Sequence, residues 1–304
     1  MIHQLDIYGK DKVEVAIERL QNFAEIFEKQ ASDEGFFVAF SGGKDSVVIK
    51  KLCDLAGVKY DAHYSVTTVD PPELVRFIFK NYPDVIPHNQ KWEKDGRWHK
   101  AGENITMWNL IPEKLYPPTR VARYCCQYLK ESAGDGRLTV TGVRWAESVN
   151  RKNNQGVVTV ANPSKKEAEE MVQSGNFTKT IRGGVVLVND NEESREAIEH
   201  CFTHRKTVLN PIIDWTDEDV WEFIHEYKVP YCELYDRGYK RLGCVGCPMS
   251  SRAAEELDRY PQIKRRYLRA FEKILITRRE RGLETEWNTP EDVMRWWLKE
   301  EVET

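Results

Sequence analysis

A short apolar run that ends in a glycine loop places the strongest constraint on the fold of this chain. Residues 36–40 (FFVAF) are continuously apolar, which is typical of a strand buried on both faces in a parallel sheet. The hexapeptide SGGKDS follows at 41–46, and residues 46–55 then carry apolar side chains at helical spacing. A strand, a tight turn and a helix in this order predict one unit of an α/β fold.

Helical and strand-like segments alternate along the first half of the chain. The apolar spacing predicts helices at residues 12–29 and 72–81, and strands at 60–66 and 138–142. Strands that alternate with helices are typical of a parallel sheet covered on both faces. The fold class that we predict is therefore α/β, with a doubly wound, Rossmann-like parallel sheet.

The same reading suggests a domain organisation. We expect an N-terminal helix within residues 1–30, a main domain at 31–249 and a helical C-terminal extension at 250–304. The pattern inside the main domain changes at 153–205, where two strand-like segments flank a polar helical stretch at 165–173. This change predicts a small inserted subdomain.

Single residues indicate one helix start and two helix breaks in the last third of the chain. Thr216 is expected to cap a helix, with Asp219 at the third helical position as a shorter stand-in for the usual glutamate. Pro261 and Pro290 interrupt the helical pattern of the last third of the chain. We therefore expect separate helices there.

The composition is that of a globular protein without a global basic field. The net charge is −4 and the pI is about 6.1, so the chain as a whole does not attract nucleic acid. The first ten residues are polar, without a signal-peptide core, and no apolar run approaches the ~20 residues that cross a bilayer. We expect a cytoplasmic protein with no membrane partner, in which the seven cysteines do not form a disulfide framework. Their spacing is then the guide to metal or redox chemistry.

The glycine loop carries groups that bind phosphate. A loop between a strand and a helix directs backbone N–H groups toward an anion, and Gly42 and Gly43 permit a tight turn. Lys44 adds a positive charge, and Asp45 can hold Mg²⁺ beside a polyphosphate. The loop matches neither the Walker A pattern nor GxGxxG. The predicted phosphate site comprises Ser41, Gly42, Gly43, Lys44, Asp45 and Ser46.

Four cysteines have the spacing of a metal site. Cys125 and Cys126 are adjacent, and Cys244 and Cys247 form a CxxC motif that follows a glycine. Four thiolates can bind a tetrahedral zinc ion or a [4Fe–4S] cluster, and the spacing alone does not choose between them. The other cysteines are expected to be structural or inert: Cys53, Cys201 and Cys232.

Five motifs in order resemble the phosphoadenosine phosphosulfate (PAPS) reductase family. They are SGGKDS, RYCCQYLK, TGVRWAESVNRK, NPIIDWTDEDVW and GCVGCPM, and the resemblance covers residues 36–249. The first is also similar to the PP-loop of the N-type ATP pyrophosphatases, which grips the pyrophosphate portion of ATP. The resemblance implies an adenine nucleotide alpha-hydrolase-like fold that binds ATP, or a related adenine nucleotide, with Mg²⁺.

The resemblance also implies roles for individual residues. In members with a CC pair and a CxxC motif, these cysteines hold a [4Fe–4S] cluster, which makes the four paired cysteines of this chain the implied ligands, with zinc as the alternative. Arg144 ends a predicted strand, where ligands bind in parallel sheets, and the family carries its nucleotide contacts there. Gly142, in the same segment, is a further implied nucleotide-binding residue. Arg123, shortly before the cysteine pair, is a candidate anion-binding residue for the nucleotide or for a negative cluster. The implied catalytic residues are Lys44, Asp45 and Arg144.

The end of the sequence bears on the reaction. Sulfonucleotide reductases of this family attack sulfur with a cysteine near the C-terminus, whereas the last cysteine here is Cys247. We therefore expect the ATP-using branch: a sulfurtransferase that adenylates an acceptor oxygen, with nucleic acid as a candidate acceptor and a protein as a candidate sulfur donor. The alternatives are an APS or PAPS reductase that releases sulfite, and a nucleotide-binding regulatory protein without turnover. Oligomeric state is left open.

The C-terminal helices carry excess positive charge. Residues 258–281 contain nine basic and only three acidic side chains, with aromatic residues among them. Such a face can meet phosphates, or it can be a solvated, salt-bridged surface. Trp296 and Trp297 are expected to pack against the domain or to form an interface.

Overall fold

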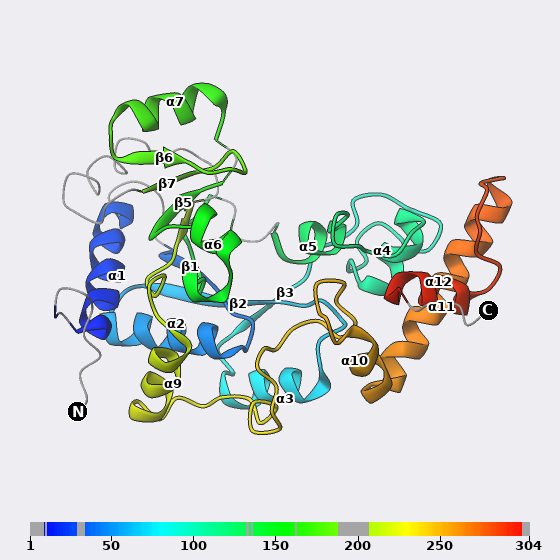
Figure 1. Ribbon diagram of the computed structural model, residues 1–304, viewed down its shortest axis with the longest axis horizontal. Coiled ribbons are helices and arrows are strands. Elements are labelled where there is room, and N and C mark those ends of the chain that lie inside the picture. Colours follow the sequence, from blue (N-terminus) through cyan, green and yellow to red (C-terminus); the bar gives the residue numbers. More distant parts are fainter. Residues whose placement is uncertain are drawn as a thin grey trace. The chain divides into compact units, whose positions relative to one another are not determined.

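The computed structural model describes residues 9, 11–28, 34–131, 134, 136–161, 163–187 and 207–299 (Figure 1). The strands are β1 (Phe36–Ala39), β2 (Tyr60–Ser65), β3 (Ile86–His88), β4 (Thr139–Val140), β5 (Val158–Val160), β6 (Phe177–Lys179), β7 (Val185–Leu187) and β8 (Thr207–Leu209). The helices are α1 (Lys12–Glu28), α2 (Lys44–Ala56), α3 (Pro72–Asn81), α4 (Met107–Lys114), α5 (Tyr124–Cys126), η1 (Gln127–Glu131, a π-helix), η2 (Trp145–Glu147, a 3₁₀-helix), α6 (Val149–Asn154), α7 (Lys165–Gln173), α9 (Asp217–Glu226), α10 (Ala253–Arg259), α11 (Pro261–Glu280) and α12 (Pro290–Leu298).

The strands form one eight-stranded sheet in the order β3-β2-β1-β4-β8-β5-β7-β6. Strands β2, β1, β4 and β8 run parallel, and Val38 in β1 lies opposite both Ala62 and Val140. Phe36, Phe37 and Val38 are buried, as a strand covered on both faces requires. The predicted α/β class with a mostly parallel central sheet is therefore confirmed.

The segment expected to be an inserted subdomain on the sheet contributes strands that pair with the central sheet. Strand β5 pairs antiparallel with β8 and with β7, and β6 pairs antiparallel with β7. Helix α7, whose predicted bounds of 165–173 are confirmed, lies over β6 (Figure 1). Antiparallel strands need only short connections, so this stretch completes the sheet locally.

The described residues divide into two compact units. The first unit takes its residues from 1–64, 77–86 and 134–240, and the second from 65–76, 87–133 and 241–304. In the first unit, α2 packs against both α1 and α9. Its apolar face, including Val47, Val48 and Leu52, is fully buried.

The second unit is largely helical. Helix α11 packs against α4, α10 and α12, and the Tyr267 ring lies 4.8 Å from the Trp297 ring. The helical pattern breaks at Pro261 and Pro290, as the sequence predicts, and the structure shows that these two prolines begin α11 and α12, where the missing N–H costs no hydrogen bond. Within the described part of the chain, no helix has both the length and the apolar character needed to cross a membrane.

The start of α9 confirms the predicted cap. The Thr216 hydroxyl accepts from the Asp219 N–H at 3.2 Å, and the Asp219 carboxylate accepts from the Thr216 N–H at 2.7 Å. Lys12 on α1 forms an ion pair with the same carboxylate. Burial raises the pKa of Asp219, but the hydrogen bonds from Lys12 and Thr216 outweigh it, so the pKa is lowered overall.

We expect Asp219→Asn to lower the free energy of unfolding by about 1 kcal/mol at neutral pH. Because the pKa of Asp219 is lower in the folded chain than in the unfolded one, its contribution is complete above the unfolded value of about 3.9 and is lost as the pH falls through the folded value. Urea unfolding at several pH values measures this. A difference from wild type that stayed constant down to acidic pH would contradict it.

Candidate functional site

The glycine loop joins β1 to α2 with the geometry that the sequence predicts. Gly42 has φ 72°, in the left-handed region that favours glycine, and Gly43 caps α2 in an extended conformation. The Ser46 hydroxyl donates to the Gly43 carbonyl at 2.9 Å and tightens the turn. The Lys44 N–H donates to the Tyr235 hydroxyl at 2.8 Å. One of the backbone N–H groups at the start of α2 is therefore already hydrogen-bonded to a side chain of the protein.

Two buried cations lie beside this loop. Lys44 is 7% exposed and Arg144, which follows β4, is 1% exposed. Arg144 donates to Asp45 at 2.7 Å through Nε and to Asp217 at 2.6 Å through Nη2. Lys44 Nζ lies 3.2 Å from the Asp45 carboxylate and 3.1 Å from that of Asp217. We call these four residues the charge network.

The pKa shifts in the charge network follow from this pairing. Burial by itself lowers the pKa of Arg144, but the charges and hydrogen bonds of Asp45 and Asp217 raise it overall. Burial raises the pKa of Asp217, and the hydrogen bonds from Lys44 and Arg144 lower it more. Arg144 and Asp217 therefore stay charged at neutral pH.

Gly142 brings the end of β4 close to the first turn of α2. A Cβ atom at this position would lie 2.8 Å from the Asp45 Cβ and 3.0 Å from the Asp45 carbonyl oxygen. These distances are too short for any side chain, so only glycine permits the approach. The structure thus gathers the predicted residues of the first unit, namely Ser41, Gly42, Gly43, Lys44, Asp45, Ser46, Gly142 and Arg144.

Sequence reasoning missed two residues of this site. Asp217 lies in the acidic run TDED, which reads as an ordinary first turn of a helix, and Tyr235 lies in an irregular segment. The signal that could have found Asp217 is β8, because a carboxylate shortly after a parallel strand lies near the ligand-binding edge of the sheet. β8 has only three residues, too few to stand out in the sequence.

The four paired cysteines all lie in the second unit. Cys125 and Cys126 end α5, and Cys244 and Cys247 lie in a turn in which the Cys247 N–H donates to the Cys244 carbonyl at 3.2 Å. Gly246, with φ 71°, allows that turn. Across the described ranges, no three His, Cys, Asp or Glu side chains have the mutual spacing that a single metal ion needs.

Charge interactions nevertheless connect the four thiols. A hydrogen bond with Cys126 raises the pKa of Cys125, and the charges of Cys244 and Cys247 raise it further. The same hydrogen bond lowers the pKa of Cys126, whose sulfur also accepts from Arg123 Nη2 at 3.2 Å. Cys126 is therefore the thiol that ionises most readily of the pair.

Two cations accompany these thiols. Arg123 contacts the Cys126 sulfur, so the structure places this predicted anion-binding residue among the cysteines of its own unit. The charge of Cys244 raises the pKa of Lys130. Burial raises the pKa of Cys244 to about 12, and the charge of Lys130 opposes that rise.

The remaining cysteines differ from these four. Cys53 on α2 and Cys232 are fully buried, and burial raises the pKa of the Cys53 thiol. Their expected structural character agrees with this burial. Cys201 lies outside the described residues.

Comparisons of the sequence with known proteins point to one family. The model of the phosphoadenosine phosphosulfate reductase domain matches residues 35–250. An adenosine 5′-phosphosulfate reductase of Oceanobacillus iheyensis is 51% identical over 203 residues, which are 65% of this chain and 62% of the relative. A phosphoadenosine 5′-phosphosulfate reductase of Xylella fastidiosa is 26% identical over 169 residues, which are 55% and 64%.

An uncharacterized protein of Methanocaldococcus jannaschii is 27% identical over 248 residues, which are 78% of this chain and 40% of the relative. The matches thus span less than two thirds of the length of each of these three relatives. The family model, by contrast, matches well over half of this chain, and all the motifs described above lie inside the matched range. The chain belongs to the phosphoadenosine phosphosulfate reductase domain family.

Proposed function

We propose that this chain is an ATP-dependent sulfurtransferase that binds ATP·Mg²⁺ at Ser41–Ser46 and adenylates an acceptor oxygen. The observation that carries the proposal is the charge network, in which Asp45 and Asp217 share the cations Lys44 and Arg144. Carboxylates repel a phosphate that cations alone would bind. Beside a phosphate loop they are useful when a divalent cation accompanies a polyphosphate.

In the proposed reaction, the loop N–H groups and the cations of the charge network hold the phosphates, and Asp45 and Asp217 hold Mg²⁺. The acceptor oxygen attacks the α-phosphorus of ATP, the bond to the bridging oxygen breaks and pyrophosphate leaves. A sulfur nucleophile then attacks the activated carbon of the acceptor, and AMP departs with the original oxygen. Lys44 and Arg144 offset the negative charge that develops on the leaving pyrophosphate.

We further propose that Cys125, Cys126, Cys244 and Cys247 hold a [4Fe–4S] cluster. The donor set fits because four thiols interact electrostatically and two cations, Arg123 and Lys130, offset their charge. A zinc ion needs four thiols around one point, whereas each thiolate of a cubane cluster binds a different iron. The resemblance of the CC pair and the CxxC motif to cluster-bearing members of the family favours the cluster over zinc. When bound, such a group supplies electron-transfer chemistry for handling sulfur.

A second candidate function is sulfonucleotide reduction. It is favoured by the names of two relatives, which are an adenosine 5′-phosphosulfate reductase and a phosphoadenosine 5′-phosphosulfate reductase. In that reaction a thiolate attacks the sulfate sulfur, the adenine nucleotide leaves and a thiol reductant releases sulfite. Both candidates use an adenine nucleotide at the charge network, and they differ in the product.

The decisive experiment compares these products on anaerobically purified protein. We expect pyrophosphate and AMP from ATP·Mg²⁺ when total cellular nucleic acid and sulfide are supplied, and no sulfite from APS or PAPS with a thiol reductant. Lys44→Met should reduce pyrophosphate release about a hundredfold, because it removes a cation from the phosphates. Lys51→Met, on the same helix, is the matched control. Sulfite without pyrophosphate would establish the reductase instead.

Asp217→Asn tests the role of Mg²⁺ without any acceptor. We expect it to weaken ATP binding about tenfold with Mg²⁺ present and to leave binding in EDTA unchanged or stronger, since one carboxylate no longer repels the phosphates. Calorimetric titration with ATP measures both conditions. Asp236→Asn, an exposed position in the same unit, should behave as wild type. Equal losses with and without Mg²⁺ would refute the metal role.

Metal analysis tests the four-cysteine site directly. We expect about four irons and four acid-labile sulfides per chain after anaerobic purification, and loss of both in Cys126→Ser and in Cys247→Ser. Cys232→Ala and Cys53→Ala should keep them, because these cysteines lie buried in the other unit. One zinc ion per chain and no iron would contradict the cluster and would support a zinc site instead.

A further inference from the structure

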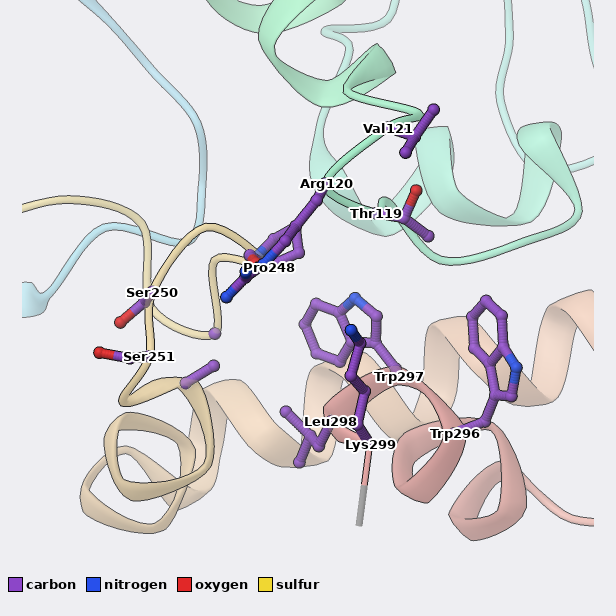
Figure 2. A pocket seen from close by; sticks show the side chains of 12 residues that line it. Thr119, Arg120, Val121, Pro248, Ser250, Ser251, Trp296, Trp297, Leu298 and Lys299 are labelled. Atoms are coloured by element: carbon purple, nitrogen blue, oxygen red, sulfur yellow. The ribbon is translucent and has the colours of Figure 1, made fainter. Parts of the chain in front are cut away.

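A pocket of about 650 Å³ opens in the second unit beside the CxxC turn (Figure 2). Its walls come from residues 119–121, from the segment 246–253, which begins at Gly246 inside the CxxC turn, and from the end of α12 at 296–299. Its volume lies in the range of pockets that bind small ligands. The sequence motifs assign no role to it.

The floor of the pocket is aromatic. Trp297 is 7% exposed, and its indole N–H donates to the Pro118 carbonyl at 2.7 Å, which holds the ring in place. Trp296 is 48% exposed, although its ring rests against Trp287 at 5.0 Å. An exposed indole backed by a second ring is a platform on which a flat ligand can stack.

The charge of the pocket is positive. None of its twelve lining residues is acidic, whereas Arg120 and Lys299 are basic and three others carry hydroxyl groups. Arg120 Nε donates to the Pro248 carbonyl at 2.8 Å, which fixes the guanidinium at the wall. Its terminal nitrogens donate to no other residue in the described part of the chain. A ligand with a planar face and a negative charge is complementary to this lining.

Lys299 stands in a conformation that favours glycine. It caps α12 with φ 58°, and its N–H donates to the Trp296 carbonyl at 3.2 Å. Left-handed backbone costs a non-glycine residue about 1 kcal/mol, and helices commonly end on glycine here. A lysine at this place keeps a positive side chain on the pocket wall at the expense of stability.

Exposed arginines occur on a neighbouring helix of the same unit. Arg265, Arg266 and Arg269 on α11 are exposed, and no ion pair with another described residue neutralises them. Helix α11 packs directly against α12, whose end forms the pocket. The second unit therefore carries further positive charge outside the pocket, on a helix that packs against α12.

We propose that this pocket binds one unstacked nucleotide of a single-stranded nucleic acid, with its base on Trp296 and its phosphate between Arg120 and Lys299. The proposal deepens the proposed function, because it names the acceptor class and places that acceptor beside the CxxC turn. Aromatic stacking together with cationic side chains is how proteins hold single strands without reading a sequence.

Binding of fluorescein-labelled single-stranded RNA, roughly twelve nucleotides long, to the full chain tests the proposal by anisotropy. We expect Trp296→Ala to bind about tenfold more weakly, as loss of one stacked base requires. Phe79→Ala, an equally exposed aromatic residue of the other unit, should bind as wild type does. Single-stranded DNA of the same sequence shows whether the pocket prefers ribose or deoxyribose. A duplex of that sequence should bind more weakly than either single strand.

Lys299→Gly separates binding from stability. Glycine adopts this backbone conformation without strain, so the unfolding midpoint of the variant should stay the same or rise. The affinity for the oligonucleotide should fall, and the slope of log affinity against log salt concentration should decrease by about 0.7, because one phosphate contact is lost. Lys228→Gly is the matched control, because Lys228 has φ 50° but lies in the first unit. Unchanged affinity in Trp296→Ala, equal losses in the two lysine variants, or equally tight binding of duplex would overturn the proposal.

The outcome is separable from that of the proposed function. Lys44→Met should bind the oligonucleotide as wild type does, because Lys44 belongs to the first unit. Oligonucleotide binding that depends on Trp296, without pyrophosphate release under any condition, would refute the sulfurtransferase and support the pocket. Pyrophosphate release with nucleic acid, together with unchanged binding in Trp296→Ala, would refute the pocket alone.

Discussion

The buried guanidinium of Arg144 is the interaction on which the organisation of the first unit depends. A charge that is 1% exposed is costly unless carboxylates surround it, and here Asp45 and Asp217 do so. These two carboxylates begin α2 and α9, while Arg144 follows β4. One pairing requirement thus brings three elements to the same edge of the sheet, where Gly142 leaves room for the approach.

The parts of the fold that were predictable from sequence have local causes. The apolar run of β1, the glycines after it and the spacing of α2 lie within about twenty consecutive residues. The starts of α9, α11 and α12 are likewise fixed by Thr216, Pro261 and Pro290 themselves. The two strand-like segments on either side of α7 were predicted and correspond to β5 and β7, whereas β6, β8 and the antiparallel pairing were not. Strands of three residues gain their stability from neighbours that are remote in sequence, so their pairing leaves no local signal.

The same distinction between local and long-range causes separates the site residues that the sequence predicted from those that it did not. The loop residues and the paired cysteines carry recognisable spacing, but Asp217 reaches Arg144 across 73 positions and Tyr235 reaches Lys44 across 191. Trp296 and Trp297 illustrate a different limit. Successive residues of a helix point in different directions, so identical neighbours take opposite roles, one exposed in a pocket and the other in the core.

The second unit is assembled from three separate stretches of the chain, and this has a consequence for biosynthesis. Cys125 and Cys126 leave the ribosome long before Cys244 and Cys247, since translation proceeds from the N-terminus. Cys125 and Cys126 are therefore present without Cys244 and Cys247 while the ribosome synthesises strands β4 to β8. Any cofactor that all four thiols hold is therefore inserted only after Cys247 has been made, and a nascent chain that ends before this residue exposes adjacent thiols to oxidation.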